Sequence, residues 1–92
     1  MNSIVHQMVE QAPQPVAPFS HAVEAGDWVF LTGQIPQDPT DDDTPLPEGI
    51  ESQTRRTMAN LELVLSGLHL TWANVVSVRV FLTHFERDYQ TM

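Results

Sequence analysis

The stretch FSHAVEAGDWVFLTG, residues 19–33, holds two short apolar-rich runs on either side of Ala25–Gly26–Asp27. The runs are Ser20–Glu24 and Trp28–Thr32. Two such runs around a glycine-containing turn are typical of a β-hairpin, since glycine readily adopts the positive φ that tight turns need. We therefore expect a hairpin here, with Trp28 and Phe30 on one strand face and packed against other residues.

The segments that flank this hairpin carry few signs of regular structure. Ser3–Val9 is a possible edge strand, and the prolines at 13, 15 and 18 predict an extended connector after it, because proline disfavours helix and donates no backbone hydrogen bond. Residues 34–49 are rich in proline and aspartate, which predicts a loop. Within it, Asp41–Asp43 lacks the alternating acids, mid-loop glycine and closing glutamate of a calcium-binding EF-hand, so we expect a solvated loop.

From Ile50 onward the apolar residues recur every three or four positions, which is typical of an amphipathic helix. The stripe consists of Ile50, Thr54, Met58, Leu61, Val64 or Leu65, and Leu68. Glu48 and Glu51 lie at its start, where negative charge favours a helix N-terminus, and Gly67 lies where the helix could close. We expect Met58 to belong to the core.

A run dense in β-branched residues, Asn74–His84, follows the helix and predicts a strand. Its apolar side chains alternate between the two faces, so much of both faces should be covered. The last eight residues, FERDYQTM, could begin a second helix. The order of strand, hairpin, helix, strand and short helix predicts an α+β fold, in which a helix lies across a mostly antiparallel or mixed β-sheet.

Composition limits the classes of function. The chain has 92 residues, so we expect one domain, residues 1–92, and its 12 acidic residues face four arginines and no lysine, for a formal net charge of −8. Nucleic-acid binding depends on Lys and Arg neutralising phosphates, so we expect no nucleic-acid partner and no membrane partner. The absence of cysteine excludes a disulfide or a thiolate nucleophile. With no signal-peptide pattern and no run of ~20 apolar residues, we expect a cytoplasmic protein.

Three stretches together resemble the YjgF/RidA (L-PSP) family of enamine/imine deaminases. They are APFSHAVEAGDWVFLTGQIPQDP at 17–39, IESQTRRTMANLELVL at 50–65 and NVVSVRVFLTHFERDYQTM at 74–92. The most specific parts are Thr32–Pro36, the helix from Gln53 to Leu61, and the Val75–Thr83 strand, which occur in the order that the family has them. The resemblance covers nearly the whole chain from Ala17 onward.

The resemblance implies a chorismate-mutase-like α+β fold of the bacillus type and a homotrimer with ligand clefts between subunits. It also implies hydrolysis of 2-iminobutanoate or 2-iminopropanoate to the 2-keto acid and ammonia, with no cofactor and no metal. Family members continue with a helix and two strands that carry an arginine for the substrate carboxylate and a glutamate near the attacked carbon. This sequence ends at Met92, before both, so we expect the family fold to be incomplete at its C-terminus.

The same resemblance implies substrate-binding roles for Phe19, Thr32, Gly33 and Gln34. Thr32 would offer its hydroxyl, and Gly33 would let the backbone approach a small planar substrate. Phe19 stands where many members have a tyrosine, so the tyrosine hydroxyl is missing. No arginine of this chain matches the family's carboxylate-binding position, so the catalytic residues are unassigned and we expect little deaminase activity from these residues alone.

Simpler explanations compete with ligand binding for several residues. Thr32 is also a common residue at a strand end. Arg55 follows Glu51 by four residues, so an exposed ion pair explains it without a ligand. The four histidines are His6, His21, His69 and His84. Their spacing matches no metal motif, so we expect surface or packed side chains and no metal site.

Two functions remain open at this point. The first is an imine deaminase whose cleft forms between protomers. The second is a non-catalytic trimer of the same family that binds a small molecule or has a regulatory role. An endoribonuclease or translation inhibitor, as some family members have been described, is disfavoured by the net charge of −8.

Overall fold

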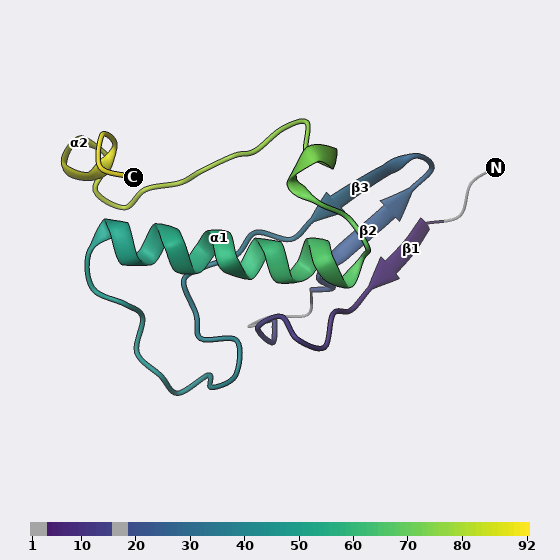
Figure 1. The fold of residues 1–92 in the computed structure, drawn as a ribbon, viewed down its shortest axis with the longest axis horizontal. Coiled ribbons are helices and arrows are strands. Elements are labelled where there is room, and N and C mark those ends of the chain that lie inside the picture. The colour runs from purple at the N-terminus through teal and green to yellow at the C-terminus, as the bar shows by residue number, and fades with distance from the viewer. Residues whose placement is uncertain (1–3, 16–18) are drawn as a thin grey trace.

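The computed structural model describes residues 4–15 and 19–92. In these ranges it has three strands, one long helix and two short helices (Figure 1). The strands are β1 (Ile4–Gln7), β2 (Ala22–Ala25) and β3 (Trp28–Leu31); the helices are α1 (Ile50–Gly67), the 3₁₀ helix η1 (Trp72–Asn74) and α2 (Phe85–Asp88). The α+β class predicted from the sequence is therefore confirmed.

The three strands form an antiparallel sheet in the order β1-β2-β3. In the first pair Ile4 lies opposite Ala25, and in the second pair Ala25 lies opposite Trp28. The second pairing is the predicted hairpin, and Gly26 in its turn has a φ of 61°, a value that glycine adopts without steric cost. Strand β1 is the predicted edge strand, and among the described residues the sheet is antiparallel throughout rather than mixed.

Helix α1 has 18 residues, from Ile50 to Gly67, and so spans about 27 Å. The prediction that the helix ends at Gly67 is confirmed, but the assumed reason is wrong: the residue with positive φ is His69, at 61°. Gly67 instead lies against the chain that follows β1. A Cβ placed on Gly67 would be 2.5 Å from Cγ1 of Val9, so this close approach is open to a residue without a side chain.

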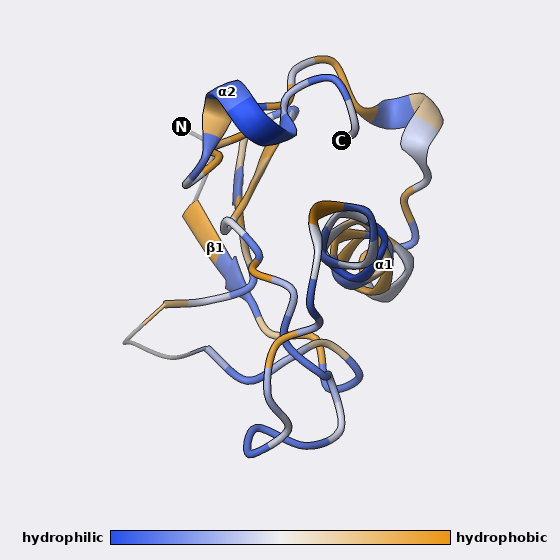
Figure 2. Ribbon diagram, turned by 90° about the vertical axis from the view of Figure 1, so that its left-hand side faces the viewer, coloured by the Kyte–Doolittle hydropathy of each residue, from blue (hydrophilic) through white to orange (hydrophobic). Residues whose placement is uncertain are grey.

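The core lies between α1 and one face of the sheet, as Figure 2 shows with α1 viewed nearly end-on. It consists of Val9, Ala12, Ala22 and Val64, with Val29, Leu31, Leu63 and Leu68 packed against it. Alternation along β3 directs Val29 and Leu31 toward this core and leaves Trp28 and Phe30 60% and 62% exposed. The expectation that these two aromatic residues are packed is therefore wrong, and Met58, expected in the core, is 41% exposed.

The predicted strand Asn74–His84 is not formed among the described residues. Residues 75–82 are extended but pair with no described strand, and Figure 1 shows them running alone from η1 to α2. Val76 and Phe81 are 78% and 84% exposed. The β-branched residues set the local extended conformation, but a strand also needs a neighbouring backbone, and no described segment provides one here. The short helix predicted for the last residues is present as α2.

Candidate functional site

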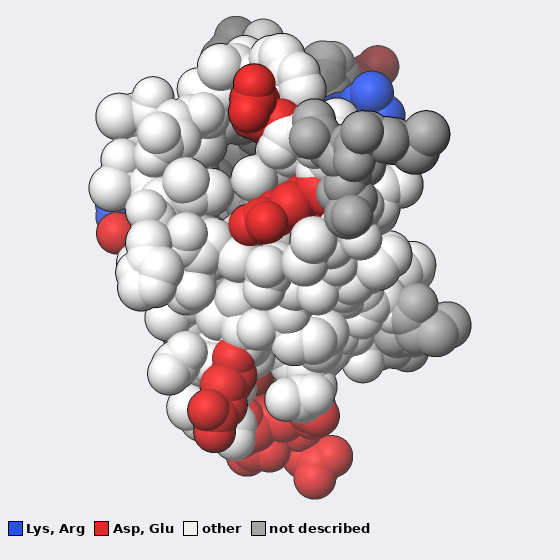
Figure 3. All heavy atoms as spheres, turned by 90° about the vertical axis from the view of Figure 1, so that its right-hand side faces the viewer, with Lys and Arg blue, Asp and Glu red and all other residues white. Residues whose placement is uncertain are grey.

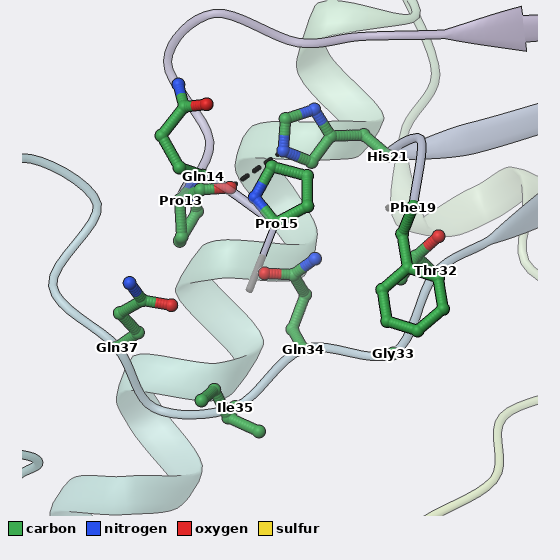
Figure 4. A pocket seen from close by; sticks show the side chains of 10 residues that line it. All are labelled: Pro13, Gln14, Pro15, Phe19, His21, Thr32, Gly33, Gln34, Ile35 and Gln37. Atoms are coloured by element: carbon green, nitrogen blue, oxygen red, sulfur yellow. Dashed lines mark hydrogen bonds between the residues drawn. The ribbon is translucent and has the colours of Figure 1, made fainter. Parts of the chain in front are cut away.

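A small pocket of about 80 Å³ lies where the loop after β3 meets the segment after β1 (Figure 4). It is lined by Pro13, Gln14, Pro15, Phe19, His21, Thr32, Gly33, Gln34, Ile35 and Gln37. The set includes all four residues for which the family resemblance implies substrate contacts. The structure therefore brings Phe19, Thr32, Gly33 and Gln34 to one place, and their role in binding a ligand stays a prediction.

Thr32 stands at the end of β3 and is half-buried. Its backbone N–H donates to the carbonyl of His21 at 3.0 Å, and its hydroxyl donates to the carbonyl of Ser20. The hydroxyl proton is therefore engaged within the protein. Since a hydroxyl oxygen also has acceptor capacity, Thr32 can still accept a hydrogen bond from a ligand N–H or O–H.

Gly33 exposes main chain to the pocket. A Cβ added there would meet no atom within 4 Å, and its φ does not lie in the positive range found at Gly26 and Gly49. Neither packing nor backbone conformation therefore requires glycine at this position. Among the described residues, the N–H groups of Gly33 and Gln34 donate to no partner.

Phe19 and Gln34 complete the predicted set. Phe19 is 55% exposed, and its ring lies next to Thr32 at one side of the pocket (Figure 4). The Gln34 side chain extends from the loop toward Pro15 and the His21 ring (Figure 4). Its carboxamide has both donors and an acceptor, so the Gln34 side chain can pair with either kind of ligand atom.

His21, which the sequence marks only as a surface or packed histidine, is 2% exposed and lies in the pocket wall. Its Nδ1 accepts the N–H of Val9 at 2.8 Å, and its Nε2 lies 2.7 Å from the carbonyl oxygen of Pro13. A carbonyl oxygen only accepts and a backbone N–H only donates, so the ring is the neutral Nε2–H tautomer. This side chain joins the start of β2 to the segment after β1.

Asn60 on α1 holds the loop after β3, at the side of the pocket opposite the segment after β1, and the sequence did not mark it as a site residue either. It is completely buried, and its Nδ2 donates to the carbonyls of Ile35 at 3.0 Å and of Gln37 at 2.8 Å. The side chain of Gln37 in turn donates to Asp42 at 2.8 Å. The one usable signal was a polar residue four positions before Val64, on the apolar side of the helix.

The described residues that line the pocket include no arginine, aspartate or glutamate. Elsewhere in the described chain, Arg55 pairs with Glu51 at 3.2 Å, as predicted, and Arg87 pairs with Asp88 at 2.8 Å. Figure 3 shows the face at the hairpin end of the molecule, where acidic side chains outnumber basic ones, in keeping with the net charge of −8. The described pocket can thus bind and orient a ligand through neutral groups, and it holds no cation for a carboxylate.

Metal binding and a membrane-spanning helix find no support in residues 4–15 and 19–92. No group of three or more His, Cys, Asp or Glu residues in these ranges is arranged to hold a metal ion. None of the helices in the same ranges has the length and apolar character needed to cross a membrane.

Comparison with known proteins identifies a family and several relatives that match most of the chain. The profile of the endoribonuclease L-PSP family matches residues 9–92. A RutC family protein of Pyrococcus horikoshii is 36% identical over 73 residues, which make up 79% of this chain and 57% of that protein. A RutC family protein of Haemophilus influenzae is 33% identical over 82 residues, or 89% of this chain and 60% of that protein.

Solved structures of related proteins have a fold that matches this chain. A Yersinia pestis protein of the conserved Rid family, YyfA, matches with a TM-score of 0.72 and 31% identity over 80% of this chain and 58% of its own. Yeast Mmf1 matches with a TM-score of 0.83 and 26% identity over 96% of this chain and 69% of its own. The chain spans between 57% and 63% of the length of three RutC family relatives.

Proposed function

Because the chain belongs to the endoribonuclease L-PSP family and has the α+β fold of the Rid proteins, incomplete relative to them, we propose that its pocket binds a small 2-imino or 2-keto acid. The proposed reaction is the hydrolysis of 2-iminobutanoate or 2-iminopropanoate to the 2-keto acid and ammonia. The observation that carries the proposal is the convergence of Phe19, Thr32, Gly33 and Gln34 on one pocket.

The reaction suits a site made of neutral groups. Water adds to the carbon of the C=N bond, the resulting amino alcohol loses ammonia, and a carbonyl replaces the imine. The imine carbon is already electrophilic, so orientation of the substrate and stabilisation of developing charge supply much of the catalysis. The free N–H groups of Gly33 and Gln34 would donate to substrate oxygen atoms, and the oxygen of Thr32 would accept from the imine N–H.

Part of the chemistry has to come from outside the described pocket. Both ring nitrogens of His21 are engaged with the protein, so no lining residue is free to act as a general acid or base in the manner of histidine. No lining residue is cationic either. The family resemblance implies a homotrimer with the ligand cleft between protomers, so a neighbouring protomer would form part of the cleft, and this assembly is part of the proposal.

The absence of a cation and a free acid or base from the pocket walls favours one second candidate, a non-catalytic family member that binds the same class of ligand. The two candidates share the pocket and differ in turnover. Ribonuclease activity is disfavoured by charge, since the chain has no lysine and Arg55, one of its two adjacent arginines, is paired with Glu51.

The test combines binding with turnover. Binding of 2-oxobutanoate is followed by NMR through the amides of Gly33 and Gln34, and clearance of 2-aminoacrylate released by a serine dehydratase is followed in a coupled assay. Binding with clearance supports the deaminase, and binding without clearance supports the non-catalytic member. If the two amides do not respond to the ligand, the pocket is not the binding site. Sedimentation velocity reports whether the protein is a trimer.

A matched pair of variants isolates the role of the exposed backbone. Gly33→Ala adds a methyl group that meets no protein atom, so the free energy of unfolding should stay the same or rise by about 0.4–1 kcal/mol. Ligand binding and turnover should fall, by roughly 10- to 100-fold for turnover, because the methyl displaces the substrate. Ser52→Ala, at an exposed position of α1, serves as the control. Equal activity of the two variants would refute a close approach of substrate to Gly33.

A further inference from the structure

One residue ties together the two chain segments that form the pocket. The backbone carbonyl of His21 accepts the N–H of Thr32 at 3.0 Å, at the β3 side of the pocket. Its ring binds the N–H of Val9 and the carbonyl of Pro13, at the side formed by the segment after β1 (Figure 4). The His21 side chain is therefore one link between these two sides, beside the pairing of β1 with β2 and the His21 N–H, which donates to the carbonyl of Gln7 at 2.9 Å.

The segment after β1 has few other internal hydrogen bonds. Among the described residues, the main chain of residues 8–15 makes one internal hydrogen bond, from the N–H of Ala12 to the carbonyl of Val9 at 3.2 Å, and two to the His21 ring. Pro13 has no N–H to donate. The described contacts that hold this segment in place are thus the His21 ring and the packing of Val9 and Ala12 in the core.

The contact to Val9 requires a neutral imidazole, whereas a protonated ring keeps its Nε2–H and can still donate to the carbonyl of Pro13. A protonated ring carries hydrogen on both nitrogens, so its Nδ1–H would face the Val9 N–H at a separation of 2.8 Å between the two nitrogens. Two donors cannot share that distance, so protonation has to break this contact. We propose that His21 is a positioning residue whose neutral ring fixes Val9 at the start of the Val9–Pro15 wall, and that protonation of the ring breaks the Val9 contact, loosens this end of the wall and weakens ligand binding.

Other titratable groups lie on the adjoining segments without contacting the His21 ring. His6 on β1 is exposed, and its Nδ1 lies 3.1 Å from Oγ of Ser20. Glu10, between Val9 and Pro13, and Glu62, on α1, are also exposed. No ion pair in the described ranges involves His21. A pH effect on the wall can thus be assigned to His21 only if it disappears when that ring alone is replaced.

The decisive variant is His21→Gln. A glutamine carboxamide offers one acceptor oxygen and an NH₂ donor, so it can accept from Val9 and donate to Pro13, and it does not titrate. All other ionisable groups remain unchanged, which makes this variant the control for general acid effects. The first readout needs no ligand: it is the hydrogen-exchange protection of the Val9 amide between pH 7.5 and pH 5.5, corrected for the intrinsic rate at each pH.

The second readout is the affinity for 2-oxobutanoate over the same range, with each variant's own value at pH 7.5 as its reference. In the wild type we expect both Val9 protection and affinity to fall on acidification, by up to about tenfold per pH unit, the limit for one linked proton. In His21→Gln both should stay within about twofold. Constant Val9 protection in the wild type, or an equal loss in the two proteins, would overturn the proposal.

This inference rests on the proposed function only for its second readout. If 2-oxobutanoate fails to bind at every pH while Val9 protection falls with acid in the wild type alone, the proposed function fails and the positioning role of His21 stands. If the ligand binds but Val9 protection and affinity show no dependence on the His21 ring, the positioning role fails and the proposed function stands.

Discussion

Gly67→Ala tests the contact that joins the end of α1 to the segment after β1. In an ordinary helix interior, replacing glycine by alanine stabilises by about 1 kcal/mol, because glycine loses more backbone entropy on folding. Here the new Cβ would lie 2.5 Å from Cγ1 and 2.9 Å from Cγ2 of Val9. Val9 is 4% exposed and β-branched, so its side chain has little freedom to turn away.

We therefore expect Gly67→Ala to lower the free energy of unfolding, whereas the same substitution in an ordinary helix interior raises it. Forcing an extra methyl group into a packed site costs about 1–3 kcal/mol. Gly67 is the last residue of α1, so the gain from helix propensity should be below its full value. We expect a net loss of about 1–2 kcal/mol in the free energy of unfolding. For a domain of this size, each kcal/mol corresponds to a shift in Tm of about 4–8 °C.

Urea denaturation followed by circular dichroism measures this loss, and a double-mutant cycle locates its cause. Val9→Ala alone should destabilise through the cavity it leaves. In the double variant the Gly67→Ala methyl group enters that space, so the two changes should couple favourably by about 0.5–3 kcal/mol. A gain of about 1 kcal/mol for Gly67→Ala, together with additive effects in the cycle, would refute the contact.

Two further predictions concern the pocket loop and the chain end. Asn60→Leu leaves the carbonyls of Ile35 and Gln37 without their donor, so it should lower the free energy of unfolding by about 2–4 kcal/mol. Urea denaturation measures this loss, and a negligible loss would mean that Asn60 is exposed and does not bind these carbonyls. Hydrogen bonds from Arg87 hold the pKa of Asp88 below the ordinary aspartate value. The ionised carboxylate therefore stabilises the fold at pH values above the ordinary aspartate pKa, and this stabilisation is lost as the pH falls through the lowered pKa. NMR titration should show the pKa rising in Arg87→Gln; an unchanged value would exclude the pair.

Some of the fold could be predicted from the sequence because its causes are local. The Ala25–Gly26–Asp27 turn lies between two apolar runs, and a hairpin needs little more than these. The apolar stripe from Ile50 repeats at helical spacing, and α1 begins and ends where that stripe predicts. The residues expected to bind substrate come from motif resemblance, and the pocket gathers all four because they flank one hairpin.

The remaining features depend on contacts between segments far apart in the chain. A β-branched run such as residues 74–84 favours extended backbone, but its partner strand has to be supplied by the rest of the structure. Periodicity likewise cannot show that Trp28 and Phe30 face away from α1, since it defines a face and not what covers it.

The hairpin, the long helix, the acidic balance and the family can all be predicted from the amino-acid sequence, because they follow from neighbouring residues, motifs or composition. The roles of His21 and Asn60 at the two sides of the pocket, and of Gly67 beside Val9, become visible in the folded chain alone. This difference arises because the structural role of a buried polar side chain, or of a close backbone approach, depends on the group that it contacts. These partners lie 8 to 58 positions away, beyond the reach of any local pattern.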